Sequence, residues 1–167
     1  MTAVLLAVGA LVVMEPITTF AHRVVFHGFG MGWHRSHHEP PRHALEANDG
    51  FPIVFAAATI VVLAVGAYIG GGEVLTPLGI GVTAYGACYL LVHDVVIHRR
   101  IGWLQPPPHF LQHWRTAHNV HHLYSRAPYG FLVPIVPADL KAKAAALGTD
   151  RTDRSPAARA AGRRALN

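Results

Sequence analysis

Histidine is the residue whose spacing could carry chemistry in this chain. Ten of the 13 histidines form two matching pairs of boxes, in which an HxxxxH box is followed by an HxxHH box. They are His22, His27, His34, His37, His38, His93, His98, His118, His121 and His122. Neutral imidazole binds zinc, copper, iron and nickel, and a buried ring has two polar nitrogens that need partners. The repeated boxes therefore predict a metal site built from these ten side chains.

The two kinds of box make different demands on a helix. Residues i, i+3 and i+4 share one helical face, so each HxxHH box can direct three imidazoles toward one point. Residues i and i+5 lie about 140° apart on a regular α-helix, which prevents an HxxxxH pair from chelating one metal there. Such a pair can bind two different metals, or one member can lie where the helix ends or bends. Ten ligands favour a centre of two metals, because a structural zinc site closes at four ligands.

Two acidic side chains beside the boxes are candidates to orient the ligands. Asp94 follows His93, and Glu39 follows His38. A carboxylate that accepts a hydrogen bond from the second ring nitrogen of a ligand fixes the tautomer and orientation of that ring. The alternative interpretations are a helix-end charge for Asp94 and a loop charge for Glu39.

Five further rings are expected to have structural roles. His43, His109 and His113 lie outside the boxes, and an isolated histidine is more often structural than a ligand. Tyr85 and Tyr89 are four residues apart in an apolar segment, so they share one face of a helix. That spacing is typical of packing residues.

The elements that hold the boxes are predicted to be membrane helices. Of the 167 residues, 51% are apolar, 14 are Lys or Arg and 9 are Asp or Glu. Apolar stretches cover about residues 1–21, 51–72 and 74–92, and between 51 and 92 the only charged residue is Glu73. These lengths suffice to cross a hydrocarbon layer about 30 Å thick. The pattern predicts an all-α integral membrane helical bundle with three or four transmembrane helices, and it excludes a disordered chain or a multidomain soluble enzyme.

Basic residues near the spans predict how the bundle lies in the membrane. Arginines occur within residues 22–50 and 93–140, whereas the first ten residues and the turn at 70–76 contain no Lys or Arg. Cytoplasmic loops carry the excess of Lys and Arg, so we expect the N-terminus outside a bacterial inner membrane and the histidine boxes on its cytoplasmic side. The apolar stretch 131–137 contains two prolines and is expected to lie at the interface rather than to cross the membrane.

The net charge of +5 is confined to residues 141–167, where seven basic residues accompany two acidic ones. We therefore predict a single membrane domain over residues 1–140 and a basic, flexible tail over residues 141–167 that lies near anionic lipid headgroups. The tail lacks aromatic residues for base stacking, which argues against nucleic-acid binding. Cys88 is the only cysteine, so an intrachain disulfide, a cysteine zinc site and a CxxCH haem attachment are excluded.

The order of the boxes and the residues around them resemble one known family. The motifs are Met14-Glu15, Ala21-His22-Arg23 through His27-Gly28, the block Gly30-Met-Gly-Trp-His-Arg-Ser-His-His-Glu-Pro40, Leu45-Glu-Ala-Asn-Asp49, Thr83-Ala-Tyr-Gly86, His93-Asp94 with His98, Ala117-His-Asn-Val-His-His122, and Gly130-Phe-Leu132. Over about residues 14–140 the chain resembles the bacterial β-carotene hydroxylases, within the histidine-rich membrane superfamily of di-iron hydroxylases and desaturases. It departs from the family's pattern around residues 105–108 and 123–129, but all ten box histidines are present.

The resemblance implies an oxygen-dependent hydroxylase that acts on carbon 3 of the β-ionone rings of β-carotene, giving β-cryptoxanthin and then zeaxanthin. It implies two Fe²⁺ ions held by the box histidines, with no catalytic residue beyond the metal centre. Electrons would come from NAD(P)H through a ferredoxin-type donor, and zinc could replace iron in the purified protein. The alternatives are a related fatty-acid or sterol hydroxylase or desaturase and, in another class, a non-redox dizinc membrane protein. A haem electron carrier is disfavoured, because clusters of three histidines at the membrane edge do not match two axial ligands.

Overall fold

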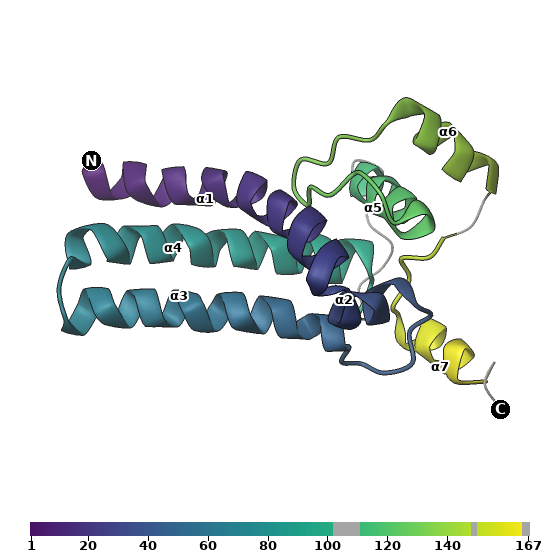
Figure 1. The fold of residues 1–167 in the computed structure, drawn as a ribbon, viewed down its shortest axis with the longest axis horizontal. Coiled ribbons are helices and arrows are strands. Elements are labelled where there is room, and N and C mark those ends of the chain that lie inside the picture. The colour runs from purple at the N-terminus through teal and green to yellow at the C-terminus, as the bar shows by residue number, and fades with distance from the viewer. Residues whose placement is uncertain (102–110, 148–149, 165–167) are drawn as a thin grey trace.

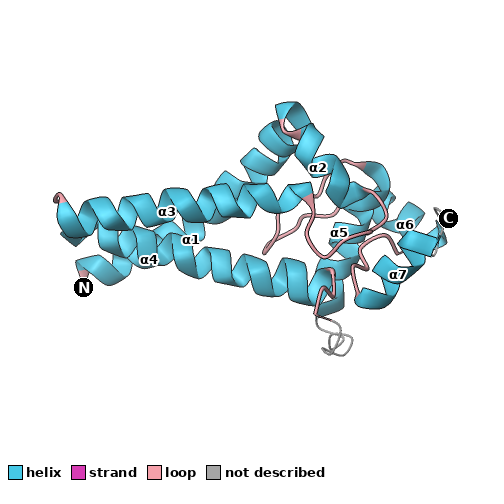
Figure 2. Cartoon of the chain, turned by 90° about the horizontal axis from the view of Figure 1, so that it is seen from below, coloured by secondary structure: helices cyan, strands magenta, loops and turns pink. Residues whose placement is uncertain are grey.

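The chain folds into three long helices that lie side by side, with the histidine-bearing segments gathered at one end (Figure 1). The computed structural model describes residues 1–101, 111–147 and 150–164. The elements are α1 (Thr2–Ala21), η1 (His22–Phe29), α2 (Met31–His38), η2 (Ala47–Asp49), α3 (Gly50–Tyr68), α4 (Gly72–Tyr89), η3 (Leu90–Ile97), α5 (Gln112–Tyr124), α6 (Ala138–Leu147) and α7 (Pro156–Arg164). Within these ranges the regular structure is entirely helical (Figure 2). His109 and the segment 105–108 lie outside the described residues.

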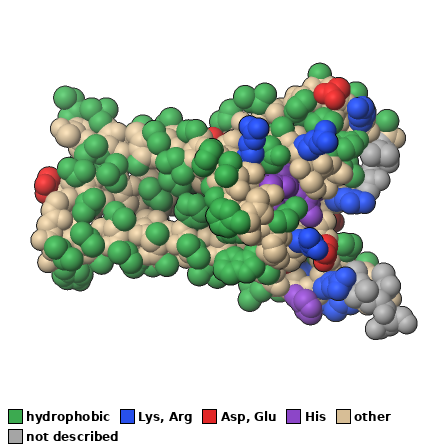
Figure 3. All heavy atoms as spheres, viewed as in Figure 1, with side chains coloured by type: hydrophobic (Ala, Val, Ile, Leu, Met, Phe, Trp, Pro, Cys, Tyr) green, Lys and Arg blue, Asp and Glu red, His purple; other side chains and the backbone are tan. Residues whose placement is uncertain are grey.

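Three helical segments are long and apolar enough to cross a membrane, namely Thr2–Phe29, Ala47–Tyr68 and Gly72–Ile97. Large apolar side chains are exposed along them, as Val4 at 65% and Ile60 at 65% show. Exposed apolar surface of this extent suits lipid rather than water. Figure 3 shows these side chains along the long helices, whereas Lys and Arg lie at the histidine end. The predicted all-α membrane bundle is confirmed, and the described residues supply three candidate spans.

Small residues allow the spans to pack closely. α4 packs against both α1 and α3. The connection between α3 and α4 turns at Gly71, whose φ of 74° lies in the left-handed region that glycine adopts without strain. On α4, a side chain at Gly81 would collide with the backbone carbonyl of Ala7 on α1. Close backbone approach of this kind is typical of membrane helices, because lipid gives no hydrophobic drive for their association.

The two ends of the bundle differ in content. The N-terminus and the α3–α4 turn lie together at one end, and α2, α5, α6 and α7 lie at the other (Figure 1). Residues 131–137 are not helical and form no span in the part of the chain that the structure describes, in keeping with their two prolines. The box histidines, which precede and follow the spans, are thereby collected at a single end of the bundle.

Part of the predicted tail packs against the membrane domain. Thr152 and Arg154 are 0% and 1% exposed, and the backbone N–H of Arg154 donates to the carbonyl of His98 over 2.7 Å. Composition could not reveal this packing, because it does not show that Arg154 meets the buried carboxylate of Glu46. The flexibility of the remainder and the boundary at residue 140 stay predictions.

Candidate metal centre

The ten box histidines form two adjacent clusters. The first contains His22, His27, His34 and His121, whose ligand atoms all lie within 4.8 Å of one another, and the second contains His37, His93, His98 and His118 on the same criterion. His38 adjoins the first cluster, since its Nε2 lies 3.1 Å from Nε2 of His34. His122 adjoins the second, with its Nε2 3.0 Å from that of His118 and 3.2 Å from that of His37. We call these groups of five the first and second histidine clusters.

The two clusters are related by an exchange between the halves of the chain. Each takes four histidines from one half and the middle histidine of the HxxHH box from the other half: His121 joins the first cluster and His37 joins the second. The expectation that an HxxHH box aims all three rings at one point is therefore wrong. Relative to residue i, residue i+3 lies about 60° to one side of the helix and residue i+4 about 40° to the other. Two metal positions on either side of the helix can exploit that separation.

The HxxxxH pairs lie on π-helical backbone, which removes the geometric obstacle. η1 and η3 both have hydrogen bonds from residue i+5 to residue i, such as His98 N–H to the His93 carbonyl at 2.9 Å and Gly30 N–H to the Val25 carbonyl at 2.8 Å. The wider turn places i and i+5 on one face, and Nε2 of His93 lies 3.2 Å from Nε2 of His98. Both members of each pair thus join the same cluster, which a regular α-helix would not permit.

Groups outside the clusters hold the second nitrogen of six rings. Backbone carbonyls accept from Nδ1 of three of them: Tyr129 from His22 at 2.9 Å, Thr152 from His98 at 2.6 Å and Arg126 from His121 at 2.7 Å. Side-chain oxygens hold three more: Asn48 with His34 at 2.7 Å, Glu46 with His37 at 3.3 Å and Asp94 with His93 at 2.8 Å. These contacts leave Nε2 of each ring directed into its cluster.

This arrangement fits a bound cation. A carbonyl oxygen only accepts hydrogen bonds, so Nδ1 of His22, His98 and His121 carries the proton and Nε2 presents a lone pair. Yet these Nε2 atoms lie close to other imidazole nitrogens, for example 3.0 Å between His121 and His27. Converging lone pairs repel one another unless a positive charge lies among them. The donor set therefore fits two metal ions, one in each cluster.

Burial keeps the rings in the form that binds metal. It lowers the pKa of His34 to about 3 and that of His38 to about 4. Burial, with repulsion between neighbouring imidazoles, also holds the pKa well below its usual value for His37, His98, His118, His121 and His122. At neutral pH these rings are uncharged, and little proton competition opposes a metal.

Of the two predicted acidic partners, the structure places only one against a histidine. Asp94 contacts His93 as described above. Glu39 is exposed instead, because α2 ends at His38 and the backbone at Glu39 is extended. Glu46 occupies the expected role beside His37, and its carboxylate also lies 3.3 Å from the Arg100 guanidinium. The sequence signal for Glu46 was its place in the block 45–49, to which spacing assigned no function.

The region that this chain shares with known proteins contains the two histidine clusters. The fatty acid hydroxylase family model matches residues 7–139, which include all ten histidines of the two clusters. The chain belongs to the fatty acid hydroxylase family. Among curated members, it is 38% identical to a β-carotene hydroxylase of Pseudescherichia vulneris over 83% of this chain and 80% of that protein. For a β-carotene hydroxylase of Pantoea ananas the identity is 42%, over 65% of this chain and 62% of the relative.

The match to a plant relative covers a smaller part of that protein. The chloroplastic β-carotene 3-hydroxylase 1 of Arabidopsis thaliana is 37% identical over 77% of this chain and 44% of that protein. No solved structure matches the chain. The family match ends before residue 140, so the buried residues around Arg154 lie beyond it.

A carboxylate inside the first span anchors one wall of this hydroxylase-family site. Glu15 accepts hydrogen bonds from the backbone N–H groups of Phe131 at 2.9 Å and Leu132 at 3.0 Å, and from the Tyr85 hydroxyl at 2.7 Å. Phe131 in turn stacks on the ring of His22, with ring centres 4.9 Å apart and planes 10° apart. In the sequence, Glu15 is marked only by its place in the Met14-Glu15 motif, which gives it no specific role. Phe131 and Leu132 lie more than 100 residues from Glu15 and Tyr85 lies 70 residues away, so spacing could not reveal these partners.

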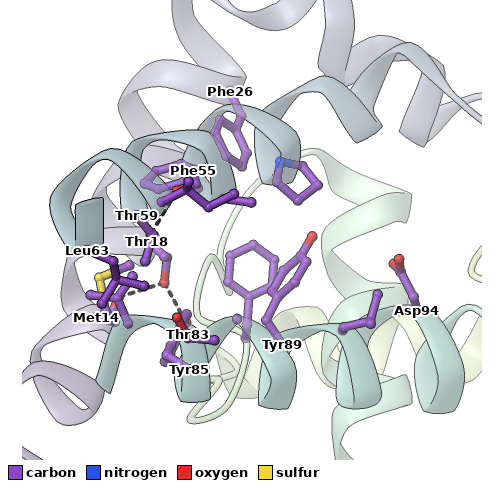
Figure 4. Close-up of a pocket in the computed structure, with 17 residues that line it drawn as sticks. Met14, Thr18, Phe26, Phe55, Thr59, Leu63, Thr83, Tyr85, Tyr89 and Asp94 are labelled. Atoms are coloured by element: carbon purple, nitrogen blue, oxygen red, sulfur yellow. Dashed lines mark hydrogen bonds between the residues drawn. The ribbon is translucent and has the colours of Figure 1, made fainter. Parts of the chain in front are cut away.

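An apolar cavity of about 450 Å³ lies between the three spans and ends beside the histidine clusters. Its lining includes Phe26, Tyr85, Tyr89 and Phe131, and Figure 4 shows Phe26 and Tyr89 on opposite sides of the space, with Asp94 toward one end. Tyr89 stacks on the ring of His93 with centres 4.7 Å apart. The two tyrosines thus pack, as their spacing predicted, and also line the cavity. His43 and His113 are exposed and lie outside both clusters.

Proposed function

We propose that the chain is a membrane hydroxylase that places a hydroxyl group on carbon 3 of the β-ionone rings of β-carotene, giving β-cryptoxanthin and then zeaxanthin. One observation carries the proposal: a single layer of aromatic rings separates the apolar cavity from both histidine clusters. Phe131 lies between the cavity and His22, and Tyr89 lies between the cavity and His93. A hydrocarbon ring bound in the cavity is therefore held next to the metal positions. The curated relatives named for β-carotene hydroxylation support this choice of substrate.

The ten histidines of the two clusters would hold two Fe²⁺ ions. When bound, the iron pair supplies the activation of dioxygen, which acid–base chemistry cannot replace at an unactivated carbon–hydrogen bond. In the overall reaction one oxygen atom enters the carbon–hydrogen bond and the other leaves as water, with two electrons from a donor and two protons from solvent. Zinc is expected to displace iron during purification, since imidazole sites bind it more tightly.

The side chains around the clusters orient the ligands and exclude water. Asp94 and Glu46 hold Nδ1 of His93 and His37, which keeps Nε2 of each ring free for a metal. The apolar lining of the cavity excludes water from the reacting bond and positions the ring through contacts with Phe26 and Tyr89. A carotenoid is about as long as the hydrocarbon layer is thick, so one terminal ring reaches the clusters while the other lies near the opposite surface. Hydroxylation of the second ring then requires the substrate to turn or to enter in the other sense.

The electron donor is proposed to be a ferredoxin-type protein, reduced by NAD(P)H, on the cytoplasmic side. Support for this sidedness comes from charge: Lys and Arg gather at the histidine end of the molecule (Figure 3), and the N-terminus and α3–α4 turn at the other end lack them. Because ferredoxins are soluble, the donor must reach the clusters from the same face.

Expression in a bacterium that accumulates β-carotene tests the proposal. The wild-type chain is expected to produce β-cryptoxanthin and zeaxanthin, and His121→Ala in the first cluster is expected to abolish both. His113→Ala is the matched control, because it removes an exposed histidine of the same helix, α5. Unchanged β-carotene with the wild-type chain in the membrane and iron supplied would refute the substrate assignment. Fatty acids and sterols would then be tested, and a dizinc protein would be recognised by the absence of dioxygen consumption.

A further inference from the structure

A short segment of the C-terminal region crosses the second histidine cluster. Residues 150–155, which we call the strap, lie between α6 and α7 and beyond the range matched by the family model. Within the strap Thr152 is 0% exposed, Arg154 1% and Ser155 9%. A fully buried arginine is rare unless its charge is paired, so the strap is packed here for a specific reason.

The strap holds His98 at two points. The Thr152 carbonyl accepts a hydrogen bond from Nδ1 of the His98 ring at 2.6 Å, and the backbone N–H of Arg154 donates to the His98 carbonyl at 2.7 Å. His98 directly follows the last residue of η3, and its backbone N–H still donates to the His93 carbonyl, so the helix fixes the backbone of His98 but not its ring. The orientation of this ring therefore depends on the strap.

The Arg154 guanidinium holds a second member of the cluster. It donates through Nη2 to the backbone carbonyl of His37 and through Nη1 to that of Glu39 at 2.7 Å. Its Nε lies 3.3 Å from Oε1 of Glu46, whose other oxygen contacts Nδ1 of His37. Arg154 thus fixes His37 through the backbone at the end of α2 and through the carboxylate that orients its ring.

The other end of the strap is tied to α5. The Asp150 carboxylate forms an ion pair with Arg115, and its Oδ1 accepts from the backbone N–H of Thr152 at 2.8 Å. The backbone N–H of Arg151 donates to Oδ1 of Asn119 at 2.8 Å. The strap is therefore connected to the helix that carries three further cluster histidines.

We infer that the strap is a positioning element that completes the second metal site, and that this chain depends for one of its two metals on residues outside the family domain. The inference rests on the proposed metal centre but not on its substrate. The first cluster serves as the internal comparison, because the carbonyls that hold His22 and His121 belong to Tyr129 and Arg126, both within the family match. Loss of the strap should weaken the second site and spare the first.

Two truncations and a pair of substitutions test the inference. A chain that ends at residue 155 lacks α7 and keeps the strap, whereas a chain that ends at residue 149 lacks both. Arg154→Gln removes the buried charge, and Arg151→Gln changes an exposed arginine of the same segment as the matched control. Total iron and zinc per chain would be measured by mass spectrometry on detergent-solubilised protein, and the tightness of binding by competition with a chelator.

The wild-type chain, the chain ending at 155 and Arg151→Gln should each retain two metals. The chain ending at 149 should retain one, and Arg154→Gln should bind the second metal about 10- to 100-fold more weakly, the usual cost of removing a group that orients a ligand. The metal kept in the first cluster shows that the chain is folded. Equal loss from both sites, or two tightly held metals in every variant, would overturn the strap's role. A wild-type chain without metal would instead refute the proposed metal centre, and the inference with it.

Discussion

Nε2 of His27 lies 3.0 Å from Nε2 of His121, although the two residues are 94 positions apart in the chain. His118 and His122, which flank His121 in the same box, belong to the other cluster. Each half of the histidine repeat therefore contributes one histidine to the cluster built by the other half. Neither half of the repeat therefore supplies all the histidines of either cluster.

This exchange predicts which histidine substitutions act together. His121→Ala and His27→Ala remove ligands of the first cluster, so the double variant should bind metal little more weakly than the worse single variant. His121→Ala combined with His98→Ala should impair both sites, and their effects on metal content should add. Metal content per chain decides between the patterns. Additive losses for His121 with His27 would show that the two rings serve different metals.

The π-helical backbone of η3 predicts that the number of residues between His93 and His98 is critical. Deletion of Val96 changes the spacing of His93 and His98 from five residues to four, and it removes the extra residue that the π-helical turn accommodates. Because His98 is then displaced from its contact with Thr152, we expect loss of the second metal and of hydroxylation. Val96→Ala keeps the spacing and should keep at least most of the activity. A deletion variant with full metal content would argue that η3 is not needed for the site.

Glu15 predicts a link between the first span and the wall of the metal centre. Glu15→Gln replaces one acceptor oxygen by an NH₂ group that faces backbone donors, so the contacts to Phe131 and Leu132 weaken. The expected cost is about 1–3 kcal/mol of stability, with a larger loss of hydroxylation because Phe131 no longer holds the ring of His22. Thermal unfolding and product formation are the measurements. Glu73→Gln, at the exposed turn on the opposite end, should change neither quantity.

The cavity predicts where added volume blocks the substrate. A side chain at Gly86, which lines the cavity, would meet no atom within 4 Å, so Gly86→Val should fold and project into the space. Turnover of β-carotene should fall while both metals stay bound. Gly9→Val is the matched control, since Gly9 is exposed on α1 and also has open space around it. If Gly86→Val hydroxylates β-carotene at the wild-type rate, the substrate does not bind in this cavity.

The sequence alone determined the class of protein and the identity of the candidate ligands. Long apolar runs whose only charged residues are Glu15 and Glu73 specify membrane helices, because a segment that crosses the hydrocarbon layer must be long and largely apolar. The repeated boxes specified ten imidazoles, since so many histidines in order have little use other than metal binding. Both properties are local, so they can be read without knowledge of how the segments meet.

Only the tertiary structure decided how those ligands are shared and held. The split of each HxxHH box depends on the distance between α2 and α5, and the cooperation of His22 with His27 depends on a π-helical turn that spacing alone left open. Glu46, rather than Glu39, orients a cluster histidine, because the chain leaves the helix at Glu39 and returns toward His37 at Glu46. The roles of Glu15 and Arg154 arise from contacts with residues that are distant in the chain, such as Phe131 for Glu15 and His37 for Arg154. Such long-range pairings depend on packing between segments, which the local order of residues does not encode.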